Sequence, residues 1–160
     1  MDFTRILNMQ SELDRNIEEA HGVENEDLTN RKLVALIVEI GEFANEIRPF
    51  KYWKKTMDIN EDHIKEEFVD GIHFFLSLTL KAGGSPVVDP IIVSEDQNIQ
   101  LSTLFEETSK LNSKFTKEQL AKAFGIYMGM GKLAGLEETE IEKFYIEKNR
   151  VNYERVLNGY

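Results

Sequence analysis

The sequence contains no cysteine and only three prolines in 160 residues. Without cysteine, a disulfide framework, a thiolate nucleophile and a zinc site built on sulfur are all excluded. Long apolar runs are missing too, because Glu, Asp, His or Lys interrupts each apolar stretch before it reaches the length of a membrane span. The N-terminal stretch "MDFTRILNMQSELD" lacks the basic start and apolar core of a secretory signal. These absences favour a cytoplasmic protein without a membrane partner.

Positive charge is also scarce. The 29 acidic residues outnumber the 19 basic residues, which gives a net charge of −10. A protein with this charge is not expected to bind nucleic acid or anionic membranes. A small phosphate ligand is still compatible, provided that a local cluster of Lys and Arg or a bound cation offsets the global field. The length and the apolar fraction of 41% predict a single domain over residues 1–160.

Helical periodicity dominates the pattern that is present, and no convincing run of alternating strand residues appears. The sequence offers N-caps at Thr29 or Asn30 and at Asn60, and a capping box formed by Thr116 and Gln119. The pattern "IIVSEDQNIQ" fits a short helix, an extended segment or a loop. We therefore predict an all-α helical bundle of about five to six helices, with helices over residues 3–20, 30–47, 61–80, 101–112, 117–132 and 139–158.

The segment "LIVEIGEFANEI" places Glu39, Glu42 and Glu46 in an otherwise apolar helix. On a helical wheel the three glutamates share one wedge, and valines and Phe43 flank that wedge on both sides. The simplest interpretation is an amphipathic helix whose acidic side chains face water. However, no Lys or Arg lies within one turn of Glu39 or Glu42 on this helix.

The segment "EEFVDGIHFFLSLTL" is apolar on nearly all sides, which indicates a buried helix that nevertheless carries Glu67 and Asp70. Burying ionised carboxylates costs several kcal/mol per group unless each is paired or bound to a metal. We therefore expect the pairs Glu39/Glu42 and Glu67/Asp70 to face one another around a divalent cation. An all-oxygen ligand set suits Mg²⁺, and Mn²⁺ would also fit. A structural ion-pair network, with lysines from other helices, is the main alternative.

The pattern Glu39-x-x-Glu42 followed by Glu67-x-x-Asp70 resembles the signature of the all-α nucleoside triphosphate pyrophosphatases, the MazG-like superfamily. The surrounding motifs "MQSELD", "FKYWKK", "DGIHFF" and "YIEKNRVNYERVLNGY" are similar to those of the dimeric dUTPase branch. The resemblance implies a homodimeric, Mg²⁺-dependent dUTP diphosphatase. Water activated by the metal would attack the β-phosphorus and release dUMP and pyrophosphate, with dUDP as a further substrate.

The resemblance also implies a role for each matching residue. The four carboxylates would hold Mg²⁺, and one of them would orient the attacking water. The substrate-binding residues would be Gln10 and Trp53 at uracil, His73 and Phe74 at the deoxyribose, Tyr145, Lys148, Arg155 and Tyr160 at the phosphates, and Asn152 near the nucleoside.

Some of these residues can be judged from chemistry alone. Tyr145, Lys148, Asn152 and Arg155 recur at spacings of 3, 4 and 3, so they share one helical face that could clamp a triphosphate. A solvated amphipathic face is the plainer interpretation of that stripe. Trp53 could equally be a core residue covered by lysine side chains, and His73 a core histidine.

The stretch "GIYMGMGKLAG" looks like a phosphate-binding loop but has the wrong glycine spacing and no Ser or Thr after its lysine, so we interpret it as close helix packing. Two alternatives to a dUTPase are open. One is a broader-specificity, MazG-like pyrophosphatase with the same metal chemistry. The other is a non-catalytic helical interaction protein, whose acidic residues form a structural network.

Overall fold

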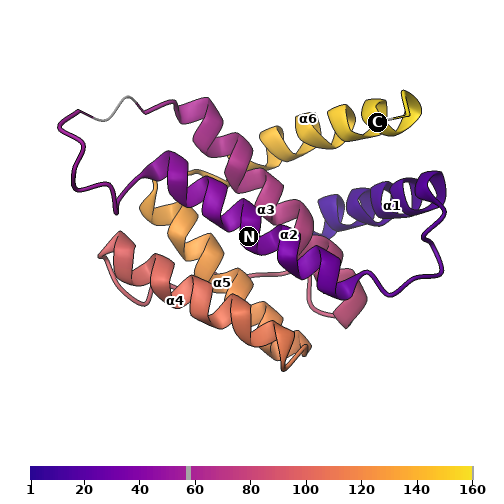
Figure 1. The fold of residues 1–160 in the computed structure, drawn as a ribbon, viewed down its shortest axis with the longest axis horizontal. Helices are drawn as coiled ribbons and strands as arrows, with labels where there is room; N and C mark the ends of the chain where they lie inside the picture. Colours follow the sequence, from indigo (N-terminus) through magenta and orange to yellow (C-terminus); the bar gives the residue numbers. More distant parts are fainter. Residues whose placement is uncertain (57–58, 160) are drawn as a thin grey trace.

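A computed structural model describes residues 1–56 and 59–159 of the chain. Within these residues the predicted all-α architecture is confirmed, and there is no β-sheet, only one isolated bridge between Asp2 and Val87. The helices are α1 (Thr4–His21), α2 (Thr29–Ile47), α3 (Glu61–Ala82), α4 (Gln97–Ser109), a short 3-10 turn η1 (Lys110–Asn112), α5 (Lys117–Leu133) and α6 (Glu138–Leu157) (Figure 1). None of the helices in the described part is long and apolar enough to cross a membrane.

The helix starts follow the local sequence in two of three predicted places. Asn60 caps α3 as predicted, because its side chain accepts hydrogen bonds from the backbone of the first turn. The cap predicted at Thr29 or Asn30 was wrong, since α2 begins after Leu28 without a side-chain cap. The capping box is half formed: Thr116 accepts from the Gln119 N–H, but the Gln119 side chain reaches α4 instead.

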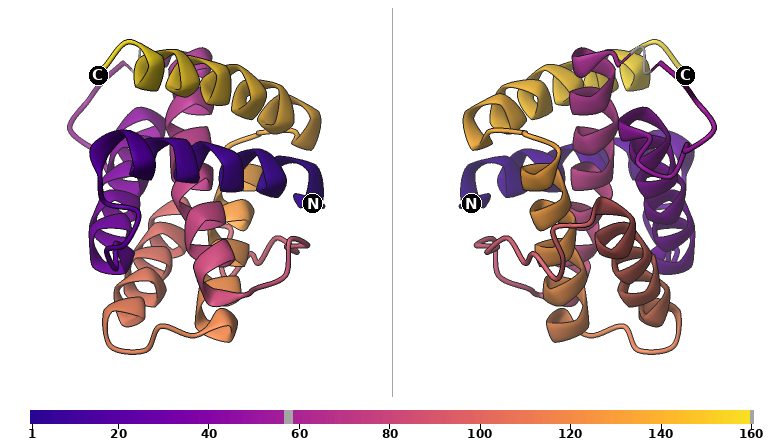
Figure 2. Two further views of the ribbon diagram at one scale, coloured as in Figure 1. Left: turned by 90° about the vertical axis from the view of Figure 1, so that its right-hand side faces the viewer. Right: turned by 90° about the vertical axis from the view of Figure 1, so that its left-hand side faces the viewer.

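Helix α3 lies at the centre of the bundle and contacts four other helices. Helix α2 runs along one side of it, α5 packs on another, and α1 and α6 lie side by side across a further face (Figure 2). This arrangement explains why α3 is apolar on nearly all sides. Glu67 and Asp70 of this helix are half-buried and line the spaces where α2 and α6 pass it, which is where the candidate site lies.

Aromatic rings form the centre of the hydrophobic core. Phe68 of α3 stacks on Tyr127 of α5 with ring centroids 4.5 Å apart, and Phe75 stacks on Phe124 at 4.6 Å. The ring of Phe43 in α2 packs against the rings of both Phe68 and Tyr127. These contacts fix α2, α3 and α5 relative to one another, so the residues on their outer faces have a rigid support.

The glycine stripe of α5 serves close packing, but only Gly131 packs against a helix as predicted, whereas Gly125 and Gly129 lie against the loop at Asp89 and Ile91. A side-chain carbon at Gly129 would collide with the backbone carbonyl of Ile91, and one at Gly131 with the ring of Phe68. The segment before α4 is a loop, held by the fully buried Gln100, which accepts a hydrogen bond from the Val93 backbone and donates one to the Ile91 carbonyl. The loop before α4 is therefore held closely against α4 and α5.

Candidate active site

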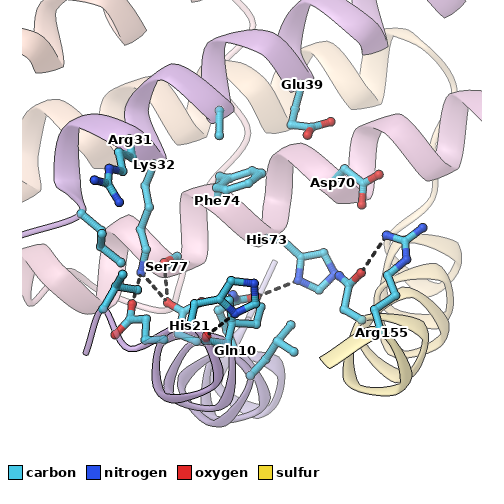
Figure 3. A pocket seen from close by; sticks show the side chains of 18 of the residues that line it. Gln10, His21, Arg31, Lys32, Glu39, Asp70, His73, Phe74, Ser77 and Arg155 are labelled. Carbon is cyan, nitrogen blue, oxygen red and sulfur yellow. Dashed lines mark hydrogen bonds and ion pairs between the residues drawn. The ribbon is translucent and has the colours of Figure 1, made fainter. Parts of the chain in front are cut away.

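A cavity of about 530 Å³ opens between α1, α2, α3 and α6. This volume is within the range of small-molecule sites. Its walls combine apolar side chains such as Leu13, Ile17 and Phe74 with charged groups from all four helices. Figure 3 shows Glu39 of α2 and Asp70 of α3 at one end of this cavity and Lys32 at the other, with Phe74 between them.

Three carboxylates converge at the Glu39 end. Glu39, Glu67 and Asp70 each offer an oxygen, and these atoms lie within 4.8 Å of one another. Glu42 lines the adjoining groove with Glu67, and its proximity contributes to the raised pKa of Glu67. The structure therefore brings all four predicted carboxylates to the α2–α3 contact.

The proximity of these groups changes their acidity. Burial, and then the negative charges of Asp70 and Glu42, raise the pKa of Glu39 to about 7. Burial and the same kind of repulsion from Asp70 and Glu42 raise the pKa of Glu67 to about 7. Burial also raises the pKa of Asp70, although a hydrogen bond from Lys148 opposes the rise. These are carboxylates that lack enough positive charge around them.

Lys148 of α6 supplies the nearest positive charge. Its Nζ lies 2.7 Å from Asp70 and 2.8 Å from Glu66, a carboxylate on the neighbouring turn of α3. Burial lowers the pKa of Lys148, but the hydrogen bonds that it donates to Asp70 and Glu66 outweigh this effect, and the net shift is upward. Among the described residues, none of the ion pairs includes Glu39 or Glu67. Lys148 thus neutralises Asp70 at one edge of the cluster and leaves Glu39 and Glu67 without an ion pair among the described residues.

The donor set fits a hard divalent cation. It offers carboxylate oxygens alone, which is the ligand type that Mg²⁺ and Mn²⁺ take. The oxygens of Glu39, Glu67 and Asp70 are close enough to share one ion, and their raised pKa values show that a cation would relieve repulsion there. The residues of this end of the cavity therefore fit the metal that the sequence pattern predicted.

A buried polar chain lines the cavity wall between the two ends. Gln10 is 3% exposed, and its amide nitrogen donates to Asp14 at 2.6 Å. Its amide oxygen lies 2.7 Å from the Nδ1 of His73 and 2.7 Å from the hydroxyl of Tyr145. Asp14 also pairs with Lys32 at 3.2 Å. Both Gln10 and His73 thus lie at the cavity, but the amide of Gln10 is already engaged by protein groups.

The remaining predicted substrate residues fall into two groups. Asn152 and Arg155 line the cavity with Lys148, and Arg155 donates to Asn152 at 3.2 Å. Tyr145 is fully buried, stacks on His73 and does not line the cavity, so it does not share the exposed stripe that its spacing suggested. Its direct contact with phosphate stays a prediction that this geometry does not support.

Trp53 and Tyr160 lie elsewhere. Trp53 is 60% exposed in the connector after α2, where its ring packs against Phe50 and Tyr52 and does not line the cavity. Tyr160 is outside the described residues, so its predicted phosphate contact is not addressed.

Sequence reasoning missed the charged end formed by Asp14, Lys32 and Ser77. Ser77 donates a short hydrogen bond to Asp14. The four-residue spacing of Gln10 and Asp14 was a local signal that these side chains meet on one helix face. The link from Asp14 to Lys32 on the next helix depends on tertiary packing, and spacing alone could not predict it.

Comparisons with known proteins agree with this geometry. A sequence model of the dUTPase family matches residues 2–160, almost the whole chain. None of the curated proteins compared with the chain matches it. The family match spans both carboxylate pairs, the cavity wall of α1 and the basic residues of α6. The chain therefore belongs to the dUTPase family of all-α hydrolases, which act as dUTP diphosphatases.

Proposed function

We propose that the protein hydrolyses dUTP to dUMP and pyrophosphate in the cavity between α1, α2, α3 and α6, with Mg²⁺ held by Glu39, Glu42, Glu67 and Asp70. The observation that carries this assignment is the convergence of three carboxylate oxygens within 4.8 Å at one end of a cavity of about 530 Å³. Mn²⁺ would fit the same oxygen ligands. When bound, the metal supplies positive charge against the triphosphate and activates the attacking water.

The side chains of α6 face the same space and suit the phosphates. Lys148 and Arg155 carry the positive charge on this wall, and Asn152 lies between them on the helix. In a protein of net charge −10, such a local basic wall is what holds an anionic ligand against the general field. Lys148 contacts Asp70, so the phosphates that it binds would lie next to the carboxylate cluster.

One of the clustered carboxylates would accept the proton of the attacking water. Glu39 is the best placed, because it lines the cavity at the carboxylate end and, unlike Asp70, it is not paired with Lys148. Phe74, which lies between the two ends of the cavity, would crowd the position of a 2′-hydroxyl and so favour deoxyribose (Figure 3).

One observation favours the broader-specificity alternative for the base. Trp53, predicted at the uracil, is 60% exposed and does not line the cavity. If Trp53 contributes to uracil selection, the connector that carries it has to approach the cavity when the nucleotide binds. If a Trp53→Ala variant keeps the preference for dUTP over dTTP, dCTP and UTP, Trp53 does not contribute to uracil recognition.

We further propose a single domain that works as a homodimer. The buried apolar residues form one continuous core, which supports the single domain. Val34 and Val38 on the outer face of α2 are 62% and 50% exposed, and Val38 lines the groove of Glu42 and Glu67. An exposed apolar strip at this position supports a dimer interface close to the carboxylate cluster.

The decisive experiment is product analysis with the purified protein, Mg²⁺ and a panel of dUTP, dUDP, UTP, dTTP and dCTP, with EDTA as the control. The expected result is metal-dependent release of dUMP and pyrophosphate from dUTP, and of dUMP and phosphate from dUDP, without turnover of UTP, dTTP or dCTP. Equal turnover of the whole panel would establish the broader pyrophosphatase. No turnover of any nucleotide would leave the non-catalytic interaction protein as the better hypothesis.

A further inference from the structure

Two hollows of the molecule meet at Lys148 of α6. The first is the cavity of about 530 Å³ that holds the candidate active site. The second has a volume of about 330 Å³ and opens between α3 and α6, where α6 crosses α3 (Figure 2). Asp70 lines the first hollow and Glu66 lines the second, whereas Lys148 lines both. Lys148 therefore lies at the boundary between the candidate active site and a space that the proposed reaction does not use.

Two adjacent glutamates of α3 face different surroundings. Glu67 belongs to the cluster with Glu39 and Asp70, and it lines the groove beside α2. The group of convergent carboxylates in the described part of the chain does not include Glu66. Successive residues of a helix point about 100° apart, and Glu66 faces α6 instead. One acid of the pair thus belongs to the proposed metal site, and the other belongs to Lys148.

The ammonium group of Lys148 lies between two carboxylates. Its Nζ is 2.7 Å from Oδ2 of Asp70 and 2.8 Å from Oε1 of Glu66. Asp70 and Glu66 are four residues apart, so both acceptors come from one face of α3. The Lys148 side chain is 15% exposed, whereas that of Glu66 is 47% exposed. Glu66 therefore holds the half-buried ammonium group from the solvent side, and Asp70 holds it from the cavity.

These two acceptors differ in what else they have to bind. Asp70 is a ligand of the proposed Mg²⁺ site, and next to a divalent cation it is a poorer partner for an ammonium group, because the two positive charges repel each other. A lysine ammonium group sits on a flexible four-carbon stem, so it turns into solvent when it has no fixed partner. Glu66 is the carboxylate in contact with Lys148 that lies outside the proposed metal site.

We propose that Glu66 is a positioning residue that keeps Lys148 at the phosphate wall of the cavity when Mg²⁺ occupies the carboxylate cluster. The inference rests on the proposed function, because it gives Glu66 a part in the hydrolysis of dUTP. Glu66 does not line the cavity, so it acts only through Lys148. An ammonium group has three hydrogens, so Lys148 can donate to Glu66 and still donate to a phosphate oxygen.

The contact with Glu66 can be removed without separating the two helices. Lys65 of α3 pairs with Glu140 of α6 at 2.9 Å and lies over the ring of Phe144, 5.7 Å from its centroid. These contacts do not involve Glu66, and they hold α6 against α3 in a Glu66→Ala protein. Because the Glu66 side chain is 47% exposed, its truncation opens no cavity in the core. A kinetic effect of this variant would therefore report on Lys148.

The first test observes Lys148 with Mg²⁺ alone. In a ¹H–¹⁵N spectrum of lysine ammonium groups, the Lys148 signal is the one that a Lys148→Met variant lacks. Without Mg²⁺, Asp70 should keep this signal visible in both wild type and Glu66→Ala. With Mg²⁺, the signal should shift but stay visible in wild type, and it should broaden beyond detection in Glu66→Ala, because the ammonium group then exchanges with water.

Three outcomes of this test would overturn the inference. They are loss of the wild-type signal with Mg²⁺, a signal that persists in Glu66→Ala with Mg²⁺, and a signal already missing from Glu66→Ala without the metal. None of these readings depends on the turnover of a nucleotide.

The second test is a double-mutant cycle in dUTP hydrolysis. Glu66→Ala should lower kcat/KM by about 10-fold, because Lys148 spends less time at the phosphates. In a Lys148→Met background the same change should have an effect within about 2-fold, since no lysine is left to position. Glu147→Ala is the matched control: Glu147 lines the same hollow, and among the described residues no ion pair joins it to Lys148. This control should stay within about 2-fold of wild type.

The kinetic outcomes separate the inference from the proposed function. An unchanged kcat/KM in Glu66→Ala, or equal losses in both backgrounds, would refute the positioning role and leave the dUTPase activity intact. An equal loss in Glu147→Ala would show that any negative charge in this hollow has the same effect, which also refutes it. A wild-type protein that does not hydrolyse dUTP would refute the proposed function, and the ammonium spectrum would still decide whether Glu66 holds Lys148.

Discussion

Glu107 of α4 and Glu39 of α2 are the same residue type in opposite electrostatic surroundings. Glu107 accepts from Lys110 at 2.8 Å, from Gln119 at 2.9 Å and from Lys122 at 3.0 Å, and these hydrogen bonds lower its pKa to about 2. Glu39 has burial and three acidic neighbours instead, and its pKa rises to about 7. One glutamate is already neutralised by the protein, whereas the other still needs a cation.

This difference separates structure from function within one small bundle. Where α4 meets α5, Lys110 and Lys122 pair with the buried Glu107. This carboxylate therefore stabilises the fold and needs no bound metal ion to neutralise it. The α2–α3 face gathers four acids and receives one lysine, at the edge of the cluster. At the candidate site, the structural ion-pair network considered from the sequence is limited to one edge, where Lys148 of α6 pairs with Asp70 and Glu66.

The strongest way to break this comparison is to neutralise each glutamate in turn. Glu39→Gln should lower kcat/KM for dUTP by about 10³-fold, because it removes one metal ligand and the candidate base. Glu107→Gln lies outside the cavity and should stay within about 3-fold of wild type. Steady-state kinetics under saturating Mg²⁺ measures both, and calorimetry of Mg²⁺ with a non-hydrolysable nucleotide shows whether metal binding falls with activity.

Equal kinetic losses in the two variants would contradict the division between the regions. Circular dichroism of both proteins excludes misfolding as the cause. If the Glu39→Gln protein is active, the general base has to be one of the other carboxylates of the cluster.

The second test exchanges the lysine at the edge of the cluster. Lys148→Met should reduce kcat/KM for dUTP by about 10- to 100-fold, because a phosphate ligand is lost. Without nucleotide, the same variant should bind Mg²⁺ a few-fold more tightly, since Lys148 no longer competes for Asp70 at 2.7 Å. Calorimetric Mg²⁺ titration of the free protein measures the second effect. Weaker metal binding in Lys148→Met would contradict the competition.

Sequence patterns predicted the local features of these two regions but not the contacts between helices. Helical spacing predicted the six helices and the facing carboxylate pairs, because each pair is local to one helix. It failed for Tyr145, whose spacing matched that of Lys148 although its side chain packs into the core against His73. It also could not find two of the three donors of Glu107, since Gln119 and Lys122 reach that residue from another helix. Local periodicity sets which face a residue occupies, and tertiary packing decides what that face meets.

The third test concerns stability and belongs to Glu107. Glu107→Ala should lower the free energy of unfolding by about 1–3 kcal/mol, because it removes three hydrogen bonds, two of them to lysines. For a protein of this size each kcal/mol corresponds to about 2–4 °C in Tm. Urea unfolding followed by circular dichroism gives the value. Glu106→Ala is the matched control, since its contact with Lys110 is exposed and should contribute much less. Equal losses in the two variants would show that Glu107 is not the anchor of this corner.

The last test is the pH dependence of the metal-free protein, for which the comparison predicts the sign of the change. Glu39 and Glu67 have folded-state pKa values of about 7 against an ordinary 4.5, so the folded state binds more protons between these limits. The free energy of unfolding should therefore fall as pH rises from about 4.5 to about 7. Excess Mg²⁺ should cancel this fall, and metal-free Glu39→Gln should show a shallower one, because one titrating group is gone. Thermal unfolding across this pH range measures all three. A metal-free protein that gained stability with pH in this window, to the same extent in wild type and Glu39→Gln, would mean that the α2–α3 carboxylates are as well neutralised as Glu107.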